Sequence, residues 1–105
     1  MVEMNEASSQ EFIDAIRCWT GWGDHVMPTR DDARLVSRFG SERGAQLLGE
    51  IKSLEDACYL SDAHMVASDI QDMAVRCARD LERKRPGIPK EIVDALVWCY
   101  TFDYK

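Results

Sequence analysis

The residues best suited to chemistry in this 105-residue chain are its cysteines and histidines. They are Cys18, Cys58, Cys77, Cys99, His25 and His64. A structural zinc site usually includes at least one pair of ligands close together in sequence, and these residues are all far apart. The sequence therefore predicts no metal ion and no cofactor.

Asp24 and His25 are the one acid–histidine pair that resembles part of a catalytic group. A general base needs an acid that orients it and a third group within hydrogen-bond reach, and adjacent loop residues rarely provide that geometry. No third member can be identified, and no hydrolase pattern accompanies the paired carboxylates elsewhere. We therefore expect no catalytic residues and a non-enzymatic protein.

The elements that must position these residues have the periodicity of helices. Apolar residues recur at helical spacing in five segments, with Gly21, Gly40 and Pro86-Gly87 as breaks. The segments are 9–20, 30–39, 42–60, 62–84 and 90–102. This pattern predicts an all-α fold, a compact bundle of about five helices, with residues 9–105 as a single domain and residues 1–8 as a frayed or disordered terminus.

Three of the helices have a distinct apolar stripe that should form the core. The stripes are Phe12, Ala15, Ile16 and Trp19; Leu47, Ile51, Leu54 and Cys58; and Val66, Ile70, Met73, Ala74, Cys77 and Leu81. Cys58, Cys77 and Cys99 lie on apolar faces and are predicted to be buried, unreactive thiols. Cys18 points away from the first stripe, so it is either exposed or covered by another element.

The segment 90–102 is predicted to be strongly apolar on almost all sides, interrupted only by Asp94 and Thr101. Such a helix is either central to the bundle or presents an apolar face to a partner, which makes a homodimer possible. A strand over 95–102 is the alternative, but no second strand is available to pair with it. Gly44 and Gly49 each cost their helix about 1 kcal/mol relative to alanine. They indicate either close helix contacts or a later helix start.

Aromatic residues occur at two places where helical periodicity does not require them. Trp22 lies in the glycine-rich loop beside Asp24 and His25, and Tyr100 and Tyr104 lie near the end of the sequence. Exposed aromatics often anchor protein partners. The alternative for both groups is that they pack back onto the bundle.

Acidic residues dominate the charge, which is −6. Glu50, Glu55, Asp56 and Asp62 gather around the end of the third helix. They form either a solvated face or a surface complementary to a basic protein. The same charge opposes binding to nucleic-acid phosphates.

Two further features bear on location and partners. No apolar run is long enough to span a membrane and no signal peptide is visible, so we expect a cytoplasmic protein without a membrane partner. Residues 30–50, with a turn at Gly40-Ser41, allow a helix-turn-helix-like DNA-binding or regulatory protein as the alternative function.

Small size, acidity, exposed aromatic candidates and the lack of a catalytic group together favour a non-enzymatic inhibitor. It would resemble in general profile the immunity proteins that neutralise a cognate bacterial toxin, for example a nuclease. It would occlude a basic active surface of that toxin domain, using Trp22, Asp24, His25, Glu50, Glu55, Asp56, Asp62, Tyr100 and Tyr104. A phage-encoded inhibitor of a host defence system is a second alternative with the same mechanism.

Overall fold

A computed structural model describes residues 6–104, with side chains from residue 9 onward. Within this range the chain forms six helices and no strand. They are α1 (Glu6–Thr20), α2 (Asp32–Phe39), α3 (Ser41–Tyr59), α4 (Ala63–Val66), α5 (Ile70–Lys84) and α6 (Lys90–Tyr104). The predicted all-α bundle is confirmed, with one short helix added.

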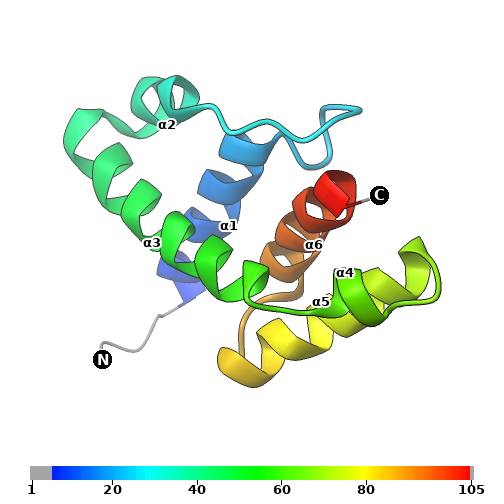
Figure 1. The fold of residues 1–105 in the computed structure, drawn as a ribbon. Coiled ribbons are helices and arrows are strands. Elements are labelled where there is room, and N and C mark those ends of the chain that lie inside the picture. Colours follow the sequence, from blue (N-terminus) through cyan, green and yellow to red (C-terminus); the bar gives the residue numbers. More distant parts are fainter. Residues whose placement is uncertain (1–5, 105) are drawn as a thin grey trace.

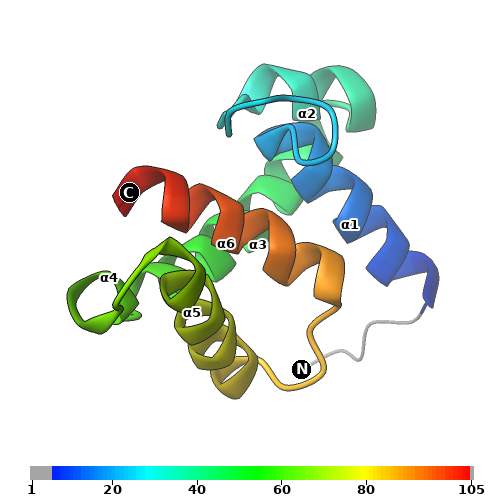
Figure 2. The same cartoon turned by 90° about the vertical axis from the view of Figure 1, so that its right-hand side faces the viewer.

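α6 passes through the middle of the fold and packs against α1, α3 and α5 (Figures 1 and 2). Its buried residues join the predicted stripes of the other helices in one core, which includes Phe12, Ala15, Ile16, Trp19, Leu47, Ile51, Cys58, Met73, Cys77, Leu81, Ile92 and Leu96. Cys58, Cys77 and Cys99 are buried, as predicted. The apolar residues of 90–102 are therefore largely satisfied inside the chain.

The description of this last helix as strongly apolar is not confirmed. Its outer side carries Lys90, Glu91 and Asp103, which are exposed, and Lys90 Nζ contacts Asp94 Oδ2 at 2.8 Å. The segment 95–102 is helical throughout, so the strand alternative is wrong. This segment folds as a helix because its backbone hydrogen bonds are all made within the segment, while neighbouring helices cover its apolar side.

α2 and α3 meet at a sharp turn of one residue. Asp31 caps α2 by accepting a hydrogen bond from Arg34 N at 3.2 Å, so this helix begins at Asp32, later than the predicted residue 30. Gly40 has a φ of 86°, which disfavours other residues. A Cβ on Gly44 would lie 3.2 Å from the carbonyl oxygen of Leu35. Gly44 therefore marks a close helix contact, whereas Gly49 has open space around it.

The predicted fourth helix, 62–84, is wrong in one respect: it is broken at residues 67–69. The backbone is extended at Ala67 and Asp69, and Asp69 caps α5 by accepting from Asp72 N at 2.7 Å. The Asp72 carboxylate accepts from Ser68 N at 3.0 Å in return. As a result Val66 and Ile70, predicted to be core, are 52% and 50% exposed.

The first helix begins at Glu6, earlier than the predicted residue 9. Of the terminus predicted to be frayed, residues 1–5 lie outside the described range. Helix α1 ends at Thr20, and Gly21 follows with a φ of 81° as the sequence predicts. None of the described helices is long and apolar enough to cross a bilayer.

Candidate functional site

A corner of the molecule formed by residues 60–70, here named the α4 corner, exposes large apolar side chains. Leu60 is 75% exposed and Met65 is 73% exposed, and Val66 and Ile70 add to the same segment. α4 lies at the edge of the fold in both ribbon views (Figures 1 and 2). Large exposed apolar groups in one segment are typical of interaction sites.

Buried polar contacts hold the α4 corner in place from below. The Tyr100 hydroxyl donates to the Ser61 carbonyl oxygen at 2.8 Å and accepts from His64 N at 3.0 Å. Ser61 Oγ donates to Asp80 Oδ2 of α5 at 2.6 Å. The apolar side chains are therefore presented by a segment that is anchored to α5 and α6.

Tyr100 was predicted to contact a partner, and in this structure its side chain is fully buried. Its burial raises the pKa of the hydroxyl, which stays protonated and able to donate. Tyr104 does lie at the surface, 40% exposed, with its ring stacked on that of His64 at a centroid distance of 4.0 Å. The aromatic end of α6 is thus half core and half surface.

The predicted acidic residues differ in how free they are to meet a partner. Asp62 is exposed in the α4 corner, and Glu50 and Asp56 are exposed on α3. Glu55 is held by Arg30, whose Nε donates to its carboxylate at 2.7 Å. Arg30 also donates to Asp103 at 2.9 Å, so it neutralises part of this acidic face.

Trp22 packs against Trp98 of α6, with ring centroids 5.2 Å apart and an interplanar angle of 54°. Both rings are half-buried. Trp22 thus packs back onto the bundle, which is the alternative to a partner contact, and its ring covers one end of the bundle. One side of the ring pair still reaches the surface.

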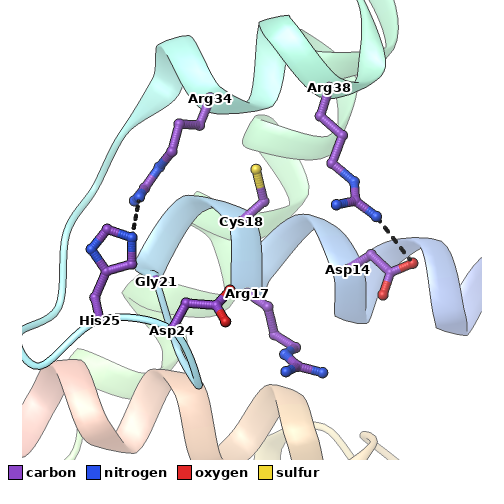
Figure 3. Close-up of a pocket in the computed structure, with 8 residues that line it drawn as sticks. All are labelled: Asp14, Arg17, Cys18, Gly21, Asp24, His25, Arg34 and Arg38. Carbon is purple, nitrogen blue, oxygen red and sulfur yellow. Dashed lines mark hydrogen bonds and ion pairs between the residues drawn. The ribbon is translucent and has the colours of Figure 1, made fainter.

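Asp24 and His25 line a cavity of about 360 Å³, here named the loop pocket (Figure 3). Its other lining residues are Asp14, Arg17, Cys18, Gly21, Arg34 and Arg38. The pocket lies between α1, the loop that follows it and α2. The predicted partner residues therefore fall into separate groups. Trp22, Asp24 and His25 lie in the loop after α1, and Asp62 lies in the α4 corner.

Three of the four cysteines are buried, and Cys18 is half-buried. Cys58 and Cys77 are buried with their sulfur atoms 3.3 Å apart, and their hydrogen bond and burial raise the pKa of the Cys58 thiol. Burial raises the pKa of the Cys99 thiol to about 11. No group of three potential metal ligands occurs in the described part of the chain.

Sequence reasoning missed two sets of residues. Leu60 and Met65 were not singled out, and the capping pattern of Ser68, Asp69 and Asp72 was the local signal that could have exposed the helix break. The arginines of the loop pocket, Arg17, Arg34 and Arg38, come from two helices. No local signal shows that they line one pocket.

Comparison with models of known protein families, with curated proteins and with solved structures gave no match.

Proposed function

We propose that this protein is a non-enzymatic inhibitor that binds a basic protein partner through the α4 corner. The observation that carries the proposal is the anchored exposure of Leu60, Met65, Val66 and Ile70. An interface centre is typically apolar, and a surface that is fixed before binding loses less conformational entropy on association. Tyr104, beside His64, supplies an aromatic side chain at the border of this surface.

The negative charge of this protein favours a basic partner. Asp62 lies within the α4 corner, Asp69 precedes Ile70, and the chain as a whole carries −6. Acidic groups around an apolar centre attract a positive surface and orient it during encounter. A toxin domain that acts on nucleic acid has such a surface, and covering it would block the toxin, as immunity proteins do.

The test is capture of the partner by matched variants. Leu60→Gln with Met65→Gln removes apolar surface from the α4 corner without changing charge. The control, Val26→Gln with Met27→Gln, makes the same exchange in the loop, where Val26 is 95% and Met27 59% exposed. We expect one basic protein to be retained stoichiometrically by the wild type and the control, to be released by the α4-corner variant, and to lose its activity on binding.

The charge contribution has its own readout in binding kinetics. Asp62→Asn should lower the association rate constant and its dependence on salt, with little change in the dissociation rate constant. Failure to retain any stoichiometric partner, or equal retention by both double variants, would overturn the proposal. A captured defence protein in place of a toxin would support the phage-encoded version of the same mechanism.

The helix-turn-helix-like alternative finds support in the close packing of α2 on α3 at Gly44. Its charges oppose it, since Glu42 and Glu50 are exposed on α3 and Arg43 is paired with Glu11 of α1. The alternative predicts retention of duplex DNA that weakens steeply with salt, which a gel shift measures.

A further inference from the structure

We propose that the loop pocket binds a small phosphorylated molecule through the guanidinium groups of Arg17, Arg34 and Arg38. Three arginines line this one cavity in a chain whose net charge is −6. Guanidinium groups bind phosphate oxygens with pairs of charge-assisted hydrogen bonds. The proposal is independent of the α4 corner, since the two sites share no residue.

Two helices and the loop contribute the groups of this pocket. Arg34 and Arg38 are four residues apart on α2, so they share a helix face, and both extend toward α1 (Figure 3). Cys18 of α1 points toward α2, whereas Arg17 extends from the other side of α1 toward the loop (Figure 3). The three arginines therefore border the pocket from two sides.

Two glycines let the loop close this tightly. Gly21 and Gly23 have φ values of 81° and 91°, which other residues rarely adopt. A Cβ on Gly21 would lie 2.8 Å from the His25 ring, and one on Gly23 would lie 2.9 Å from Arg17 Nη2. The unusual sequence around Trp22 thus positions a histidine and an arginine at the pocket.

Arg34 is held rigidly by the protein itself. Its Nη2 donates to the Trp19 carbonyl oxygen at 3.1 Å and to Thr29 Oγ1, and its Nη1 donates to His25 Nε2 at 2.9 Å. His25 must then carry its proton on Nδ1. Arg34 Nε lies 3.5 Å from Asp31 Oδ2. One hydrogen of Arg34 Nη1 has no partner within the described residues 6–104, and the position of the guanidinium is already fixed by the other contacts.

Arg17 and Arg38 have most of their donors available. Arg17 Nε reaches the Trp22 carbonyl oxygen only at 3.5 Å, and Arg38 Nη2 lies 3.9 Å from Asp14 Oδ2, which is too far for a hydrogen bond. Among the described residues, their terminal nitrogens have no hydrogen-bond partner. These unused donors of Arg17 and Arg38 are what an anion would satisfy.

The volume of the loop pocket and its two acidic lining residues define the class of ligand. A cavity of about 360 Å³ is at the small end of ligand pockets. Asp14 and Asp24 also line it, and they would accept hydrogen bonds from hydroxyl or amino groups on the molecule that carries the phosphate. A cavity of this size takes a small molecule and not a polymer, so we assign a small phosphate monoester.

Cys18 provides the readout, because its half-buried thiol lines the pocket. The neutral reagent iodoacetamide would alkylate it without competing for the arginines. With inorganic phosphate or ribose 5-phosphate at twice the dissociation constant, mass action slows alkylation about threefold, compared with chloride at equal ionic strength. Broadening of the phosphorus resonance of inorganic phosphate gives a second measurement that does not use Cys18.

Matched variants make the test specific. Arg17→Gln and Arg38→Gln should abolish both signals, and Arg79→Gln, which removes an exposed arginine from α5, should preserve them. Equal effects of phosphate and chloride, or signals that persist in the Arg17→Gln and Arg38→Gln variants, would overturn the site. Equal protection by citrate would overturn the assignment to phosphate, and stronger protection by duplex DNA would overturn the assignment to a small molecule.

Discussion

Single side chains in this protein often join elements that are distant in sequence. Arg30 is the clearest example, because it bonds Glu55 of α3, Tyr59 of α3 and Asp103 of α6. Burial disfavours its charge, but the hydrogen bonds with Glu55 and Asp103 raise its pKa on balance. Burial and the hydrogen bond to Asp103 also raise the pKa of the Tyr59 hydroxyl. Arg30 therefore fixes the start of α2 to the end of α6.

Replacing Arg30 tests this role. Arg30→Gln should lower the free energy of unfolding by about 1–2 kcal/mol, because a network of charge-assisted hydrogen bonds contributes more than an isolated surface pair. Chemical denaturation measures the change. The control Arg79→Gln should stay within about 0.5 kcal/mol of the wild type. Equal stability of the two variants would contradict the role given to Arg30.

Pairs of helices are positioned by backbone approach as well as by side chains. Gly44 lets α3 lie directly on the backbone of α2, and the nearest carbon of Val36 would be 3.3 Å from an added Cβ. Gly49 lies on the same helix with no atom within 4 Å. One helix thus contains a glycine that packing requires and another that packing does not.

These two glycines should respond in opposite ways to alanine. Gly49→Ala should raise the free energy of unfolding by roughly 0.5–1 kcal/mol, through helix propensity alone. Gly44→Ala gains the same propensity but must push α2 away, and overpacking of this kind costs about 1–3 kcal/mol. We expect Gly44→Ala to be the less stable variant by denaturation. A gain in both variants would show that α2 moves freely.

The break between α4 and α5 depends on an ionised carboxylate. Hydrogen bonds from Ser68 and the ion pair with Arg76 lower the pKa of Asp72 from its ordinary 3.8. A lowered pKa in the folded state stabilises the fold above 3.8, and this stabilisation disappears as the pH falls through the folded value.

Asp72→Asn tests that dependence. The wild type should be more stable than the variant near neutral pH, and the difference should shrink as the pH falls below 3.8. Denaturation at a series of pH values measures it. Asp94→Asn, which removes a carboxylate from a surface pair on α6, serves as the comparison at each pH. A difference between wild type and Asp72→Asn that does not change with pH would contradict this assignment.

At the scale of the whole molecule, one core joins helices from both ends of the chain. Cys58, Cys77 and Cys99 lie in α3, α5 and α6 and are buried in the described structure. Burial also keeps two of these thiols protonated, since it contributes to the raised pKa values of Cys58 and Cys99. Access to any of them requires the core to open.

Alkylation can therefore report whether the chain unfolds as one unit. Cys18 should react in the native protein, and Cys58, Cys77 and Cys99 should react only on unfolding, with the same dependence on denaturant. Mass spectrometry of labelled peptides measures each site separately. Faster labelling of Cys77 than of Cys58 and Cys99 would show that α5 opens on its own and that the single core is less cooperative than proposed.

Much of this fold follows from the sequence. Helical periodicity predicts four of the helices to within a few residues, and merges α4 and α5 into one. It also predicts the burial of Phe12, Ile16, Leu47, Ile51 and Leu81, because the spacing of apolar residues is a local property. The same pattern places three cysteines in the core. The acidic balance and the glycine-rich loop are also evident without a structure.

The tertiary structure alone decided which surfaces are available. Burial of the Tyr100 ring and its bonds to Ser61 and His64 anchor the α4 corner, and this contact spans α4 and α6. The presence of Arg17, Arg34 and Arg38 at one pocket depends on how α2 lies across α1. Such arrangements follow from the relative orientation of helices, which is set by long-range packing and leaves no pattern in the spacing of residues along one segment.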